Sequence, residues 1–599
     1  MSFPDLRAFL DQLRRDGDLV EVGAEVDPVQ EAAEIHRRVV AAGGPALLFT
    51  RPSGADFPLV TNLFGTARRA ELAFGERPQR FIRRLVETVE TALPPTIGSL
   101  WGARDVAAQV LKVGLRRGRR GPVTEVVTDD VRLDRLPALT TWPEDGGPFI
   151  TLPLVFTEHP DGRGHNLGMY RLQVHDATAT GMHWQIGKGG GFHYRVAEDR
   201  GESLPVTVFL GGPPALTLAA IAPLPENVPE LLLASLIAGE RLGLVEGVGP
   251  HPLVARAEFA LMGSVAPLIR RPEGPFGDHY GYYSLTHDYP VFQVSRIARR
   301  RDAIFPATVV GKPRQEDFFI GDLLQDLLSP LFPLVMPGVT DLWSYGETGY
   351  HSLSAAVVKQ RYAREAMASA FRILGEGQLS LTKFLLVTDQ PVDLKDFRAT
   401  LEHLLARTNT ETDLYVFSNL SMDTLDYTGP EVNLGSKGIW LGLGEPVRSL
   451  PEQFSASELP SGCGSVEVFC RGCLVVGGPP KADDPDLASR VASHPAFADW
   501  PLVVLTDEPA RAVRSAMNFL WTTFTRFEPA ADVHAAATRV VRNHLVYTAP
   551  IVIDARLAPS FPGELHCDPE VADTVSTRWK EYFPDGRVEM GDAERGHLD

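Results

Sequence analysis

Apolar side chains recur at helical spacing near the start of the chain. A helix over residues 5–15 would place four of them on one face: Leu6, Phe9, Leu10 and Leu13. The pattern repeats over residues 29–40, where Asp27 and Pro28 predict an N-cap and a first helical residue. The apolar run at 45–49 is typical of a buried strand. This part of the chain therefore predicts helices with a short strand between them.

The pattern changes between about residues 122 and 315, where short alternating or apolar runs are separated by turns. Four of these runs predict strands: 151–157, 204–210, 290–297 and 303–310. Such a region suits a barrel or sandwich with inserted helices. Beyond Gly321, predicted helices at 322–328, 355–374 and 394–406 alternate with a strand at 383–388. That alternation predicts an α/β domain.

One apolar motif occurs twice in the C-terminal half of the chain. Residues 384–391, Phe-Leu-Leu-Val-Thr-Asp-Gln-Pro, resemble residues 502–509, Leu-Val-Val-Leu-Thr-Asp-Glu-Pro. A helical pattern follows each copy, and a second aspartate, Asp413 or Asp532, closes the unit 24 or 25 residues after the first. Because the downstream spacing also matches, we interpret residues 451–599 as a degenerate duplicate of a domain at 319–450.

The composition is that of a soluble protein with several domains. The chain has 599 residues, of which 44% are hydrophobic, and this length predicts about two to four domains. The 58 Lys and Arg against 76 Asp and Glu give a formal net charge of −18. That charge disfavours nucleic acid or an anionic membrane surface as the main partner. The basic run Arg116–Arg120 fits a solvated loop or a contact between subunits.

Targeting signals and a disulfide framework are not evident in the sequence. The first residues lack the order of a signal peptide, and the apolar stretch 231–238 is far shorter than the ~20 residues of a membrane span. The cysteines are too few for a disulfide framework: Cys463, Cys470, Cys473 and Cys567. We expect structural or incidental cysteines, with a zinc or redox site at Cys470-x-x-Cys473 as the alternative. The protein is expected to be cytoplasmic, without an integral membrane segment.

Polar residues that suit catalysis concentrate between Asn166 and Asp278. Asn166 and Arg171 are five residues apart, so on a straight strand they would face opposite sides unless Gly168 allows a bend. Lys188 precedes three glycines, and bare backbone amides beside one cation suit a phosphate, although the order of a Walker A loop is missing. The alternative is a surface arginine, a turn asparagine and a Gly-rich hairpin turn.

Two further segments carry carboxylates. Glu230 opens an apolar helix, where the helix dipole favours an anion in the first turn. With Asn166 and His193 it would also offer oxygen and nitrogen donors that suit manganese or magnesium rather than structural zinc. Glu273 and Asp278 lie in a loop of glycines, prolines and aromatic residues. Two acids that converge on one site tend to split their pKa values, which leaves one of them protonated.

These segments resemble the signature segments of the UbiD family of prenylated-FMN-dependent decarboxylases. The similar segments are Asn-Leu-Gly-Met-Tyr-Arg at 166–171, Thr-Gly-Met-His-Trp-Gln at 180–185 with Lys-Gly-Gly at 188–190, and Pro-Glu-Gly-Pro-Phe-Gly-Asp at 272–278. Further matches lie at 290–294, 381–387 and 433–438. The resemblance covers residues 1–450 in order, so the chain is similar to a long form of the family with an extra C-terminal domain.

The resemblance implies an α/β (α+β) fold with four domains. They are an N-terminal α/β domain at 1–120, a central split β-barrel of the flavin reductase-like type that binds the cofactor at 121–318, a C-terminal α/β domain at 319–450 and an accessory α/β domain at 451–599.

The resemblance also implies roles for single residues. The catalytic set is Arg171, Glu273 and Asp278. The residues expected to contact the cofactor are Asn166, Met169, Tyr170, Arg171, His183, Trp184, Gln185, Lys188 and Gly189. The metal ligands are Asn166, His193 and Glu230, with His183 as the alternative histidine. The implied cofactors are prenylated FMN, a divalent metal, with manganese favoured, and a potassium ion. A flavin prenyltransferase would supply the flavin, and the protein is expected to be a homo-oligomer.

The implied reaction is the reversible, non-oxidative decarboxylation of an aromatic or α,β-unsaturated carboxylic acid through a covalent prenylated-FMN adduct. Arg171 would hold the substrate carboxylate, and Asp278, or Glu273 through it, would protonate the carbon. The long form points to quinone-type biosynthesis. One alternative is a flavin reductase-like oxidoreductase on the same barrel, which would need no pair of acids. Another is a non-catalytic assembly or cofactor-carrier subunit.

Overall fold

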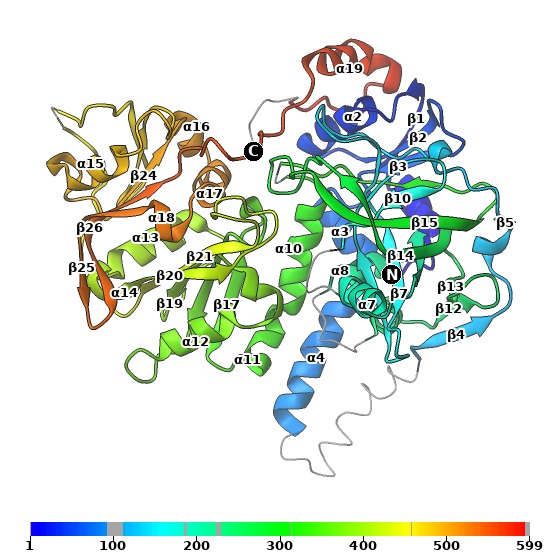
Figure 1. The fold of residues 1–599 in the computed structure, drawn as a ribbon, viewed down its shortest axis with the longest axis horizontal. Coiled ribbons are helices and arrows are strands. Elements are labelled where there is room, and N and C mark those ends of the chain that lie inside the picture. The colour runs from blue at the N-terminus through cyan, green and yellow to red at the C-terminus, as the bar shows by residue number, and fades with distance from the viewer. Residues whose placement is uncertain are drawn as a thin grey trace. The chain divides into compact units, whose positions relative to one another are not determined.

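The computed structural model describes residues 2–92, 112–184, 189–222, 229–312, 314–456 and 458–592, which divide into two units. Unit 1 contains the described residues up to Leu327 and those from Glu564 onward, and unit 2 contains Leu328–Gly563. Both units combine helices with parallel and antiparallel strands (Figure 1). The predicted mixed α/β fold is therefore confirmed.

The N-terminal part of unit 1 is a small sheet with helices around it. Its strands are hydrogen-bonded in the order β1-β2-β3-β16. The strands are β1 (Leu19–Val26), β2 (Ala46–Pro52), β3 (Leu59–Thr61) and β16 (Phe305–Pro306), and the helices are α1 (Leu6–Asp16), α2 (Glu31–Ala41), α3 (Ala67–Phe74) and α4 (Arg77–Ala92).

Local sequence explains one of the first two helices and misleads at the other. The Asp5 side chain caps α1 by accepting from the backbone N–H of Ala8, and the predicted apolar face of α1 is buried. The predicted cap at Asp27 is wrong, because α2 begins only at Glu31. Asp27 instead accepts from the N–H of Val29 in the preceding turn, at 2.8 Å.

The central part of unit 1 is built on a seven-stranded sheet with the order β10-β15-β14-β11-β7-β8, in which β5 also pairs with β15. Its strands are β5 (Val126–Thr128), β7 (Leu154–Glu158), β8 (His165–Met169), β10 (Ala179–Gly181), β11 (Leu204–Leu210), β14 (Phe259–Glu273) and β15 (His287–Arg299). Two smaller sheets contain β4 (Leu115–Gly118), β12 (Leu242–Val245) and β13 (Leu253–Val254), and β6 (Phe149–Ile150) with β9 (Leu172–Gln173). The helices are α7 (Gly189–Asp199), α8 (Pro214–Ile221) and α9 (Glu230–Ala238).

The sequence pattern located this sheet well. The predicted strand at 204–210 coincides with β11, and those at 151–157 and 290–297 overlap β7 and β15. The run at 303–310 contains only the two-residue strand β16, which joins the N-terminal sheet. Among the described residues, the strand order of the large sheet is open at β10 and β8.

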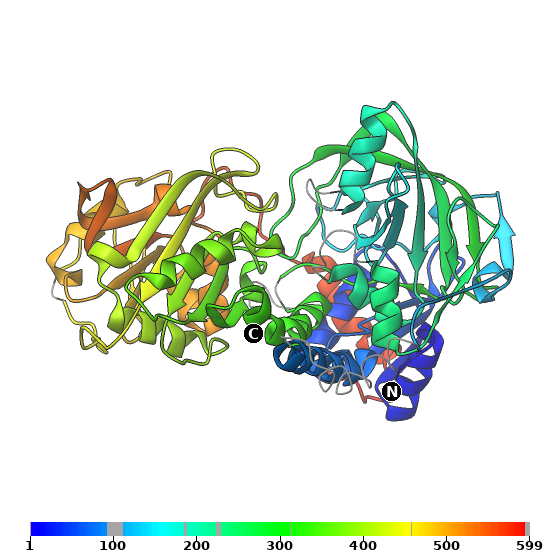
Figure 2. The same ribbon diagram turned by 90° about the horizontal axis from the view of Figure 1, so that it is seen from below.

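Unit 2 contains two five-stranded sheets (Figure 2). The first, in the order β17-β18-β19-β21-β20, is made of β17 (Val339–Ser344), β18 (Leu353–Val358), β19 (Phe384–Thr388), β20 (Leu414–Ser421) and β21 (Leu434–Gly442). The second, in the order β22-β23-β24-β26-β25, is made of β22 (Val466–Cys470), β23 (Cys473–Gly477), β24 (Leu502–Thr506), β25 (Val533–Val541) and β26 (His544–Asp554). The helices that follow α10 (Glu316–Leu328) are α11 (Phe332–Val335), α12 (Glu365–Leu374), α13 (Phe397–Arg407), α14 (Thr410–Asp413), α15 (Leu487–Ser493), α16 (Pro509–Val513), α17 (Ala516–Phe524) and α18 (Pro529–Asp532).

The two sheets share more than strand order. In each, the aspartate after the central strand accepts from a backbone N–H beyond the last strand of the sheet. Asp389 accepts from Gly444 and Asp507 from Leu557, both at 2.8 Å. The second aspartates of the two repeats also match, because each forms an ion pair with a basic side chain. Asp413 pairs with Arg364, and Asp532 pairs with Lys481. These common contacts support our inference that the second sheet arose by duplication of the first.

Residues beyond Gly563 belong to unit 1 rather than to the second sheet, which divides the segment predicted as one domain at 451–599. Helix α19 (Pro569–Tyr582) packs on α2, as the red and blue helices in Figure 1 show. Arg38 of α2 donates to the carbonyl of Ala572 at 2.8 Å, and Glu31 pairs with Arg578. We call residues 564–592 the C-terminal segment.

One helical stretch, Glu316–Val335, has the length and mean hydropathy (1.4) of a membrane span. It is the only one of this kind among the residues that the structure describes. A single stretch of this kind is weak evidence, because core helices of soluble proteins meet the same criteria.

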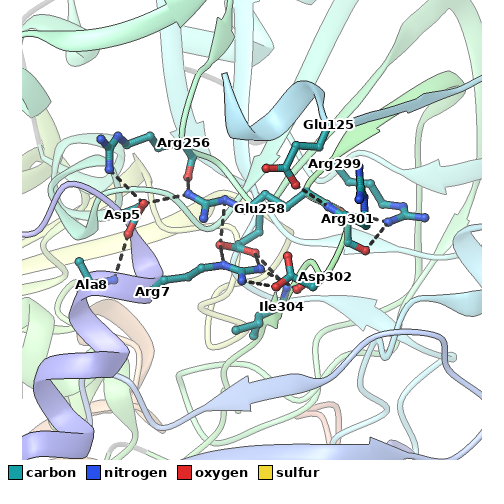
Figure 3. A network of polar contacts seen from close by, with 11 residues as sticks. Asp5, Arg7, Ala8, Glu125, Arg256, Glu258, Arg299, Arg301, Asp302 and Ile304 are labelled. Atoms are coloured by element: carbon teal, nitrogen blue, oxygen red, sulfur yellow. Dashed lines mark hydrogen bonds and ion pairs between the residues drawn. The ribbon is translucent and has the colours of Figure 1, made fainter. Parts of the chain in front are cut away.

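A buried network ties α1 to the central sheet (Figure 3). Glu258 is fully buried and accepts from Arg7 at 3.0 and 3.1 Å and from the N–H of Ile304 at 3.0 Å. Arg300 lies 3.3 Å from Glu258 and donates to Asp5 at 2.9 Å. Arg7 also contacts Asp302, whose side chain is 75% exposed.

We predict that Glu258→Gln lowers the free energy of unfolding by about 3 kcal/mol, because it leaves the buried Arg300 and the partly buried Arg7 without the charge that they share. Asp302→Asn removes the exposed partner of the same Arg7 and should cost less than about 1 kcal/mol. Urea unfolding of both variants measures the difference. Equal losses would show that the buried position of Glu258 is not what matters.

Candidate active site

Arg171 lies at the centre of the predicted catalytic set. It follows β8, and its Nε donates to Glu273 Oε1 at 3.0 Å while Nη1 donates to Asp278 Oδ2. Nη2 donates to the hydroxyl of Ser284 at 3.1 Å, and the guanidinium lies over the ring of Phe276 at 4.5 Å. The structure therefore brings Arg171 together with two acids that lie 102 and 107 positions later in the sequence.

The end of β8 lies between two groups of site residues. β8 pairs with β7 in unbroken register through Gly168 and ends at Met169, so Arg171 lies beyond the strand while Asn166 lies within it. No register shift marks the bend at Gly168 that the sequence suggested. Asn166 and Arg171 thus serve different groups of residues.

The loop that carries Asp278 is held by contacts with residues 142–146 and 173. Gln173 accepts from the N–H of Gly274 at 2.9 Å, and Asp145 accepts from the N–H of Gly277 at 2.8 Å. Trp142 packs directly against Gly277, where a Cβ would lie 2.0 Å from the indole ring. Any side chain at Gly277 would therefore displace the loop. The positions of Glu273 and Asp278 depend on these contacts.

Glu273 is fully buried at the end of β14. Its Oε1 also accepts from His183 Nδ1 at 2.8 Å, and the His183 ring lies against Tyr289. Its Oε2 has no hydrogen-bond partner among the described residues. An unpartnered buried carboxylate oxygen is costly unless a ligand or proton completes it. His183 thus contacts Glu273, and the Oε2 of Glu273 faces Gly181, where a Cβ would lie 3.0 Å from this oxygen.

Neither acid has the raised pKa that the sequence predicts. Burial alone would raise the pKa of Asp278, but the hydrogen bond and charge of His279, with Arg171, hold it well below its usual range. Burial would likewise raise the pKa of Glu273, and His183 and Arg171 together lower it. Both acids are therefore ionised at neutral pH, because His279 and His183, together with Arg171, outweigh the effect of burial.

A third acid was missed by the sequence reasoning. Burial raises the pKa of Asp317, in the first turn of α10, to about 6, and the charge of Asp278 adds to this while His279 opposes it. Its Oδ1 has no hydrogen-bond partner among the described residues. Only the three-dimensional structure identifies it, because a carboxylate in the first turn of a helix is ordinary.

The predicted metal ligands Asn166 and Glu230 are in contact. Asn166 Nδ2 donates to Glu230 Oε1 at 3.0 Å, and its Oδ1 accepts from the hydroxyl of Tyr170 at 3.1 Å. Glu230 Oε2 has no hydrogen-bond partner in the described part of the chain, and burial raises the pKa of this carboxyl. Such an oxygen is available to a cation.

His193 lies on the same side of the sheet as Asn166. Its Nδ1 is 2.9 Å from the hydroxyl of Thr157, which is directly opposite Asn166 in the β7–β8 ladder. Burial, with His159 and His165 nearby, lowers the pKa of His193 to about 4, so the ring is neutral at pH 7. Within the described ranges no three His, Cys, Asp or Glu side chains form a metal-binding group by themselves.

The other residues predicted to contact the cofactor include Tyr170, which contacts Asn166, and Gly189, which lies against Asn166. Tyr170 and Trp184 are nearly buried, Met169 is half-buried on β8, and Trp184 Nε1 has no hydrogen-bond partner among the described residues. A Cβ at Gly189 would lie 2.7 Å from Asn166 Nδ2, and one at Gly190 would lie 2.6 Å from Trp184 Nε1. The predicted residues Gln185 and Lys188 lie outside the described residues.

Three family models match the chain, and together they cover the predicted residues of the candidate site. Those of the 3-octaprenyl-4-hydroxybenzoate carboxy-lyase match its N-terminal domain at residues 10–89, its Rift-related domain at 115–313 and its C-terminal domain at 318–441. The chain belongs to the UbiD family of carboxy-lyases. It is therefore an enzyme, as the resemblance implied.

Relatives of the family differ in how much of the chain they match. A protein of Chlamydia pneumoniae, named as a 4-hydroxybenzoate decarboxylase subunit, is 50% identical over 98% of this chain and 99% of its own length. A protein of Archaeoglobus fulgidus is 39% identical over 73% of this chain and 91% of its own. Residues beyond 441 are thus shared with the chlamydial protein but lie outside the family models.

Solved structures of the UbiD class share the fold. The vanillic acid decarboxylase of Sedimentibacter hydroxybenzoicus in closed form superimposes with a TM-score of 0.66 at 24% identity, covering 77% of this chain and 97% of that one. An evolved dimeric form of HmfF from Pelotomaculum thermopropionicum, in complex with prFMN, gives 0.60 at 22% identity, covering 76% and 97%. At these sequence identities, the similarity shows a shared fold and nothing further.

We predict that the carboxyl of Asp278 makes stability depend on pH. Its folded pKa lies below the unfolded value of about 3.9, so its contribution is present above about pH 4 and is lost as the pH falls. The difference in unfolding free energy between the wild type and Asp278→Asn should therefore shrink by about 0.7 kcal/mol between pH 7 and about pH 3.5. Urea unfolding at several pH values measures it.

Ser284→Ala is the matched control, because it removes a contact of the same Arg171 without removing a titrating group. Its stability deficit should stay constant over the pH range. A pH-independent deficit for Asp278→Asn would contradict the assignment of an ionised Asp278.

Proposed function

We propose that the protein catalyses the reversible, non-oxidative decarboxylation of an aromatic or α,β-unsaturated carboxylic acid, with prenylated FMN as cofactor. The observation that carries this proposal is the buried Arg171 guanidinium, held between Glu273 and Asp278. A fixed arginine can bind a carboxylate, and an adjacent acid can return a proton to carbon.

Arg171 is fixed in place but keeps donors for a substrate. Each Nη carries two hydrogens, so the contacts with Asp278 and Ser284 leave N–H groups that can hold an incoming carboxylate. The ring of Phe276 on one face of the guanidinium restricts its orientation. Because the site is buried, a substrate carboxylate bound there would be shielded from water.

Asp278 would donate the proton only after the substrate has bound. The free site keeps the pKa of Asp278 low because Arg171 and His279 face it. A substrate carboxylate would share the positive charge of Arg171 and add a negative charge, and both effects raise the pKa of Asp278. Asp317, with a pKa of about 6, can hold a proton nearby near neutral pH. Proton uptake is thereby coupled to the arrival of the acid.

The residues around Asn166 fit a flavin phosphate and its metal. The unpartnered oxygen of Glu230, the Asn166 amide and the neutral ring of His193 form an oxygen and nitrogen donor set that suits a divalent cation such as manganese. Gly189 and Gly190 allow close approach to Asn166 and Trp184, which a phosphate-binding turn requires. When bound, prenylated FMN supplies an electron sink for the electron pair that CO2 leaves behind.

We further infer that the seven-stranded sheet of unit 1 is the split β-barrel of the family. The register shifts in β14 and β15, which bend these long strands, support this inference. A hydroxybenzoate or related aromatic acid is the preferred substrate class, because the name of the chlamydial relative refers to 4-hydroxybenzoate. A role in quinone-type biosynthesis is consistent with that class.

The test is to purify the protein after production with and without a flavin prenyltransferase. We expect a flavin absorbance band in the first preparation, and CO2 release from at least one member of a panel of hydroxybenzoates, dihydroxynaphthoates and cinnamic acids. Absence of both the band and CO2 release would reject the proposal. A flavin band with hydride transfer but no CO2 release would favour a flavin reductase-like activity.

We predict that Asp278→Asn abolishes CO2 release while flavin binding persists, because the amide cannot donate the carboxyl proton. Asp176→Asn is the matched control, since Asp176 pairs with Arg271 at the exposed side of the same sheet. Flavin absorbance and CO2 release are measured on both variants. Decarboxylation at the parent rate by Asp278→Asn would refute its role.

We predict that Glu230→Gln lowers the affinity for Mn²⁺ by about 100-fold, because a buried anionic donor is lost. Glu240→Gln, at the exposed position that follows α9, should leave the affinity unchanged. Titration calorimetry and metal analysis of the purified protein measure the binding. Equal affinities in the two variants would remove Glu230 from the ligand set.

A further inference from the structure

The C-terminal segment contacts the loop that carries Asp278. Leu565 donates its N–H to the carbonyl of Gly281 at 3.0 Å, and Glu564 forms an antiparallel bridge with Tyr282. The loop itself is a tight turn, because Asp278 donates its N–H to the carbonyl of Tyr282 at 3.1 Å. The segment thus pairs with this turn through a single β-bridge and one further backbone hydrogen bond.

The side chain of Leu565 completes the packing around Trp142. Leu565 is fully buried and packs with Trp142 and Tyr283 in a cluster of its own. Trp142 lies against the backbone on two sides, since a Cβ at Gly277 or at Gly311 would come within 2.3 Å of its ring. Leu565 therefore packs against Trp142, which lies between the Asp278 loop and the chain that leads to α10.

A charged contact joins the segment to that second chain. Glu564 Oε1 lies 2.9 Å from Lys312 Nζ, and both side chains are nearly buried. Lys312 precedes the first turn of α10, which contains Asp317. The two neighbouring residues Glu564 and Leu565 thus contact both the loop that carries Asp278 and the chain that leads to Asp317.

The remainder of the segment is anchored at a distance from the loop. Val575 and Tyr582 of α19 lie in the core that unit 1 shares between its two main sheets, and Arg38 of α2 holds the backbone of Ala572. Residues 564 and 565 are therefore fixed by a packed helix on their C-terminal side.

We propose that Glu564 and Leu565 are positioning residues for the proton-donating Asp278, so that the C-terminal segment is part of the active-site scaffold. This inference rests on the proposed function of Asp278. The three family models end at residue 441, so this support comes from outside the domains that the models describe.

The test compares Leu565→Ala with Val575→Ala in the full-length protein produced with the flavin prenyltransferase. Both changes remove buried apolar atoms from the C-terminal segment, but only Leu565 touches the loop. For Leu565→Ala we expect hydrogen exchange in residues 274–284 to become about tenfold faster, because the loop opens more often. We expect kcat to fall about tenfold with KM little changed, since proton donation needs exact placement of Asp278. Leu565→Met should restore both.

Val575→Ala should leave loop exchange and kcat as in the wild type. Glu564→Gln, which removes the charge beside Lys312, should act in the same direction as Leu565→Ala and decides the question if Leu565→Ala does not fold. Unchanged loop exchange in the Leu565 and Glu564 variants, or an equal rise in Val575→Ala, would overturn the proposal. Because hydrogen exchange needs no turnover, it tests positioning even if the wild type decarboxylates no acid of the panel.

Discussion

The structure of the active site depends on one buried cation shared by two carboxylates. Arg171 carries one positive charge, whereas Glu273 and Asp278 carry two negative charges when both are ionised. An unpaired charge at this depth would be strongly unfavourable, so the three groups hold each other in place. The arrangement also keeps both acids ionised until another anion arrives. An anion bound beside Arg171 would therefore raise the pKa of both acids.

A single strand positions both halves of the chemistry. β8 carries Asn166, which contacts Glu230, and the residues that follow the strand carry Arg171, which contacts both acids. The proposed site for phosphate and metal and the proposed site for the carboxylic acid would thus be a fixed distance apart along one piece of backbone. Sites carried on strands are placed more accurately than sites on loops. Arg171 and Asp278 both lie outside helices and strands, and several other segments hold the loop that carries Asp278.

Sequence reasoning reached the parts of this structure that local pattern or a family motif encodes. The apolar spacing in α1 and the run that forms β11 predict their elements, because side-chain periodicity is a local property. The cap at Asp27 failed because local propensity does not fix the first turn of a packed helix. The low pKa of Asp278 and the high pKa of Asp317 could not be predicted, since they arise from burial and from neighbours distant in sequence.

The length of the chain has two separate explanations. The second sheet of unit 2 is complete at β26, which ends at Asp554, and its aspartate contacts repeat those of the first sheet. The duplication that we infer would account for that sheet but not for the residues after it, which belong to unit 1. Leu565 of this segment is buried against Trp142, a contact that an unrelated extension of the chain would not require. Through that contact, the C-terminal segment packs against the part of unit 1 that carries the candidate active site.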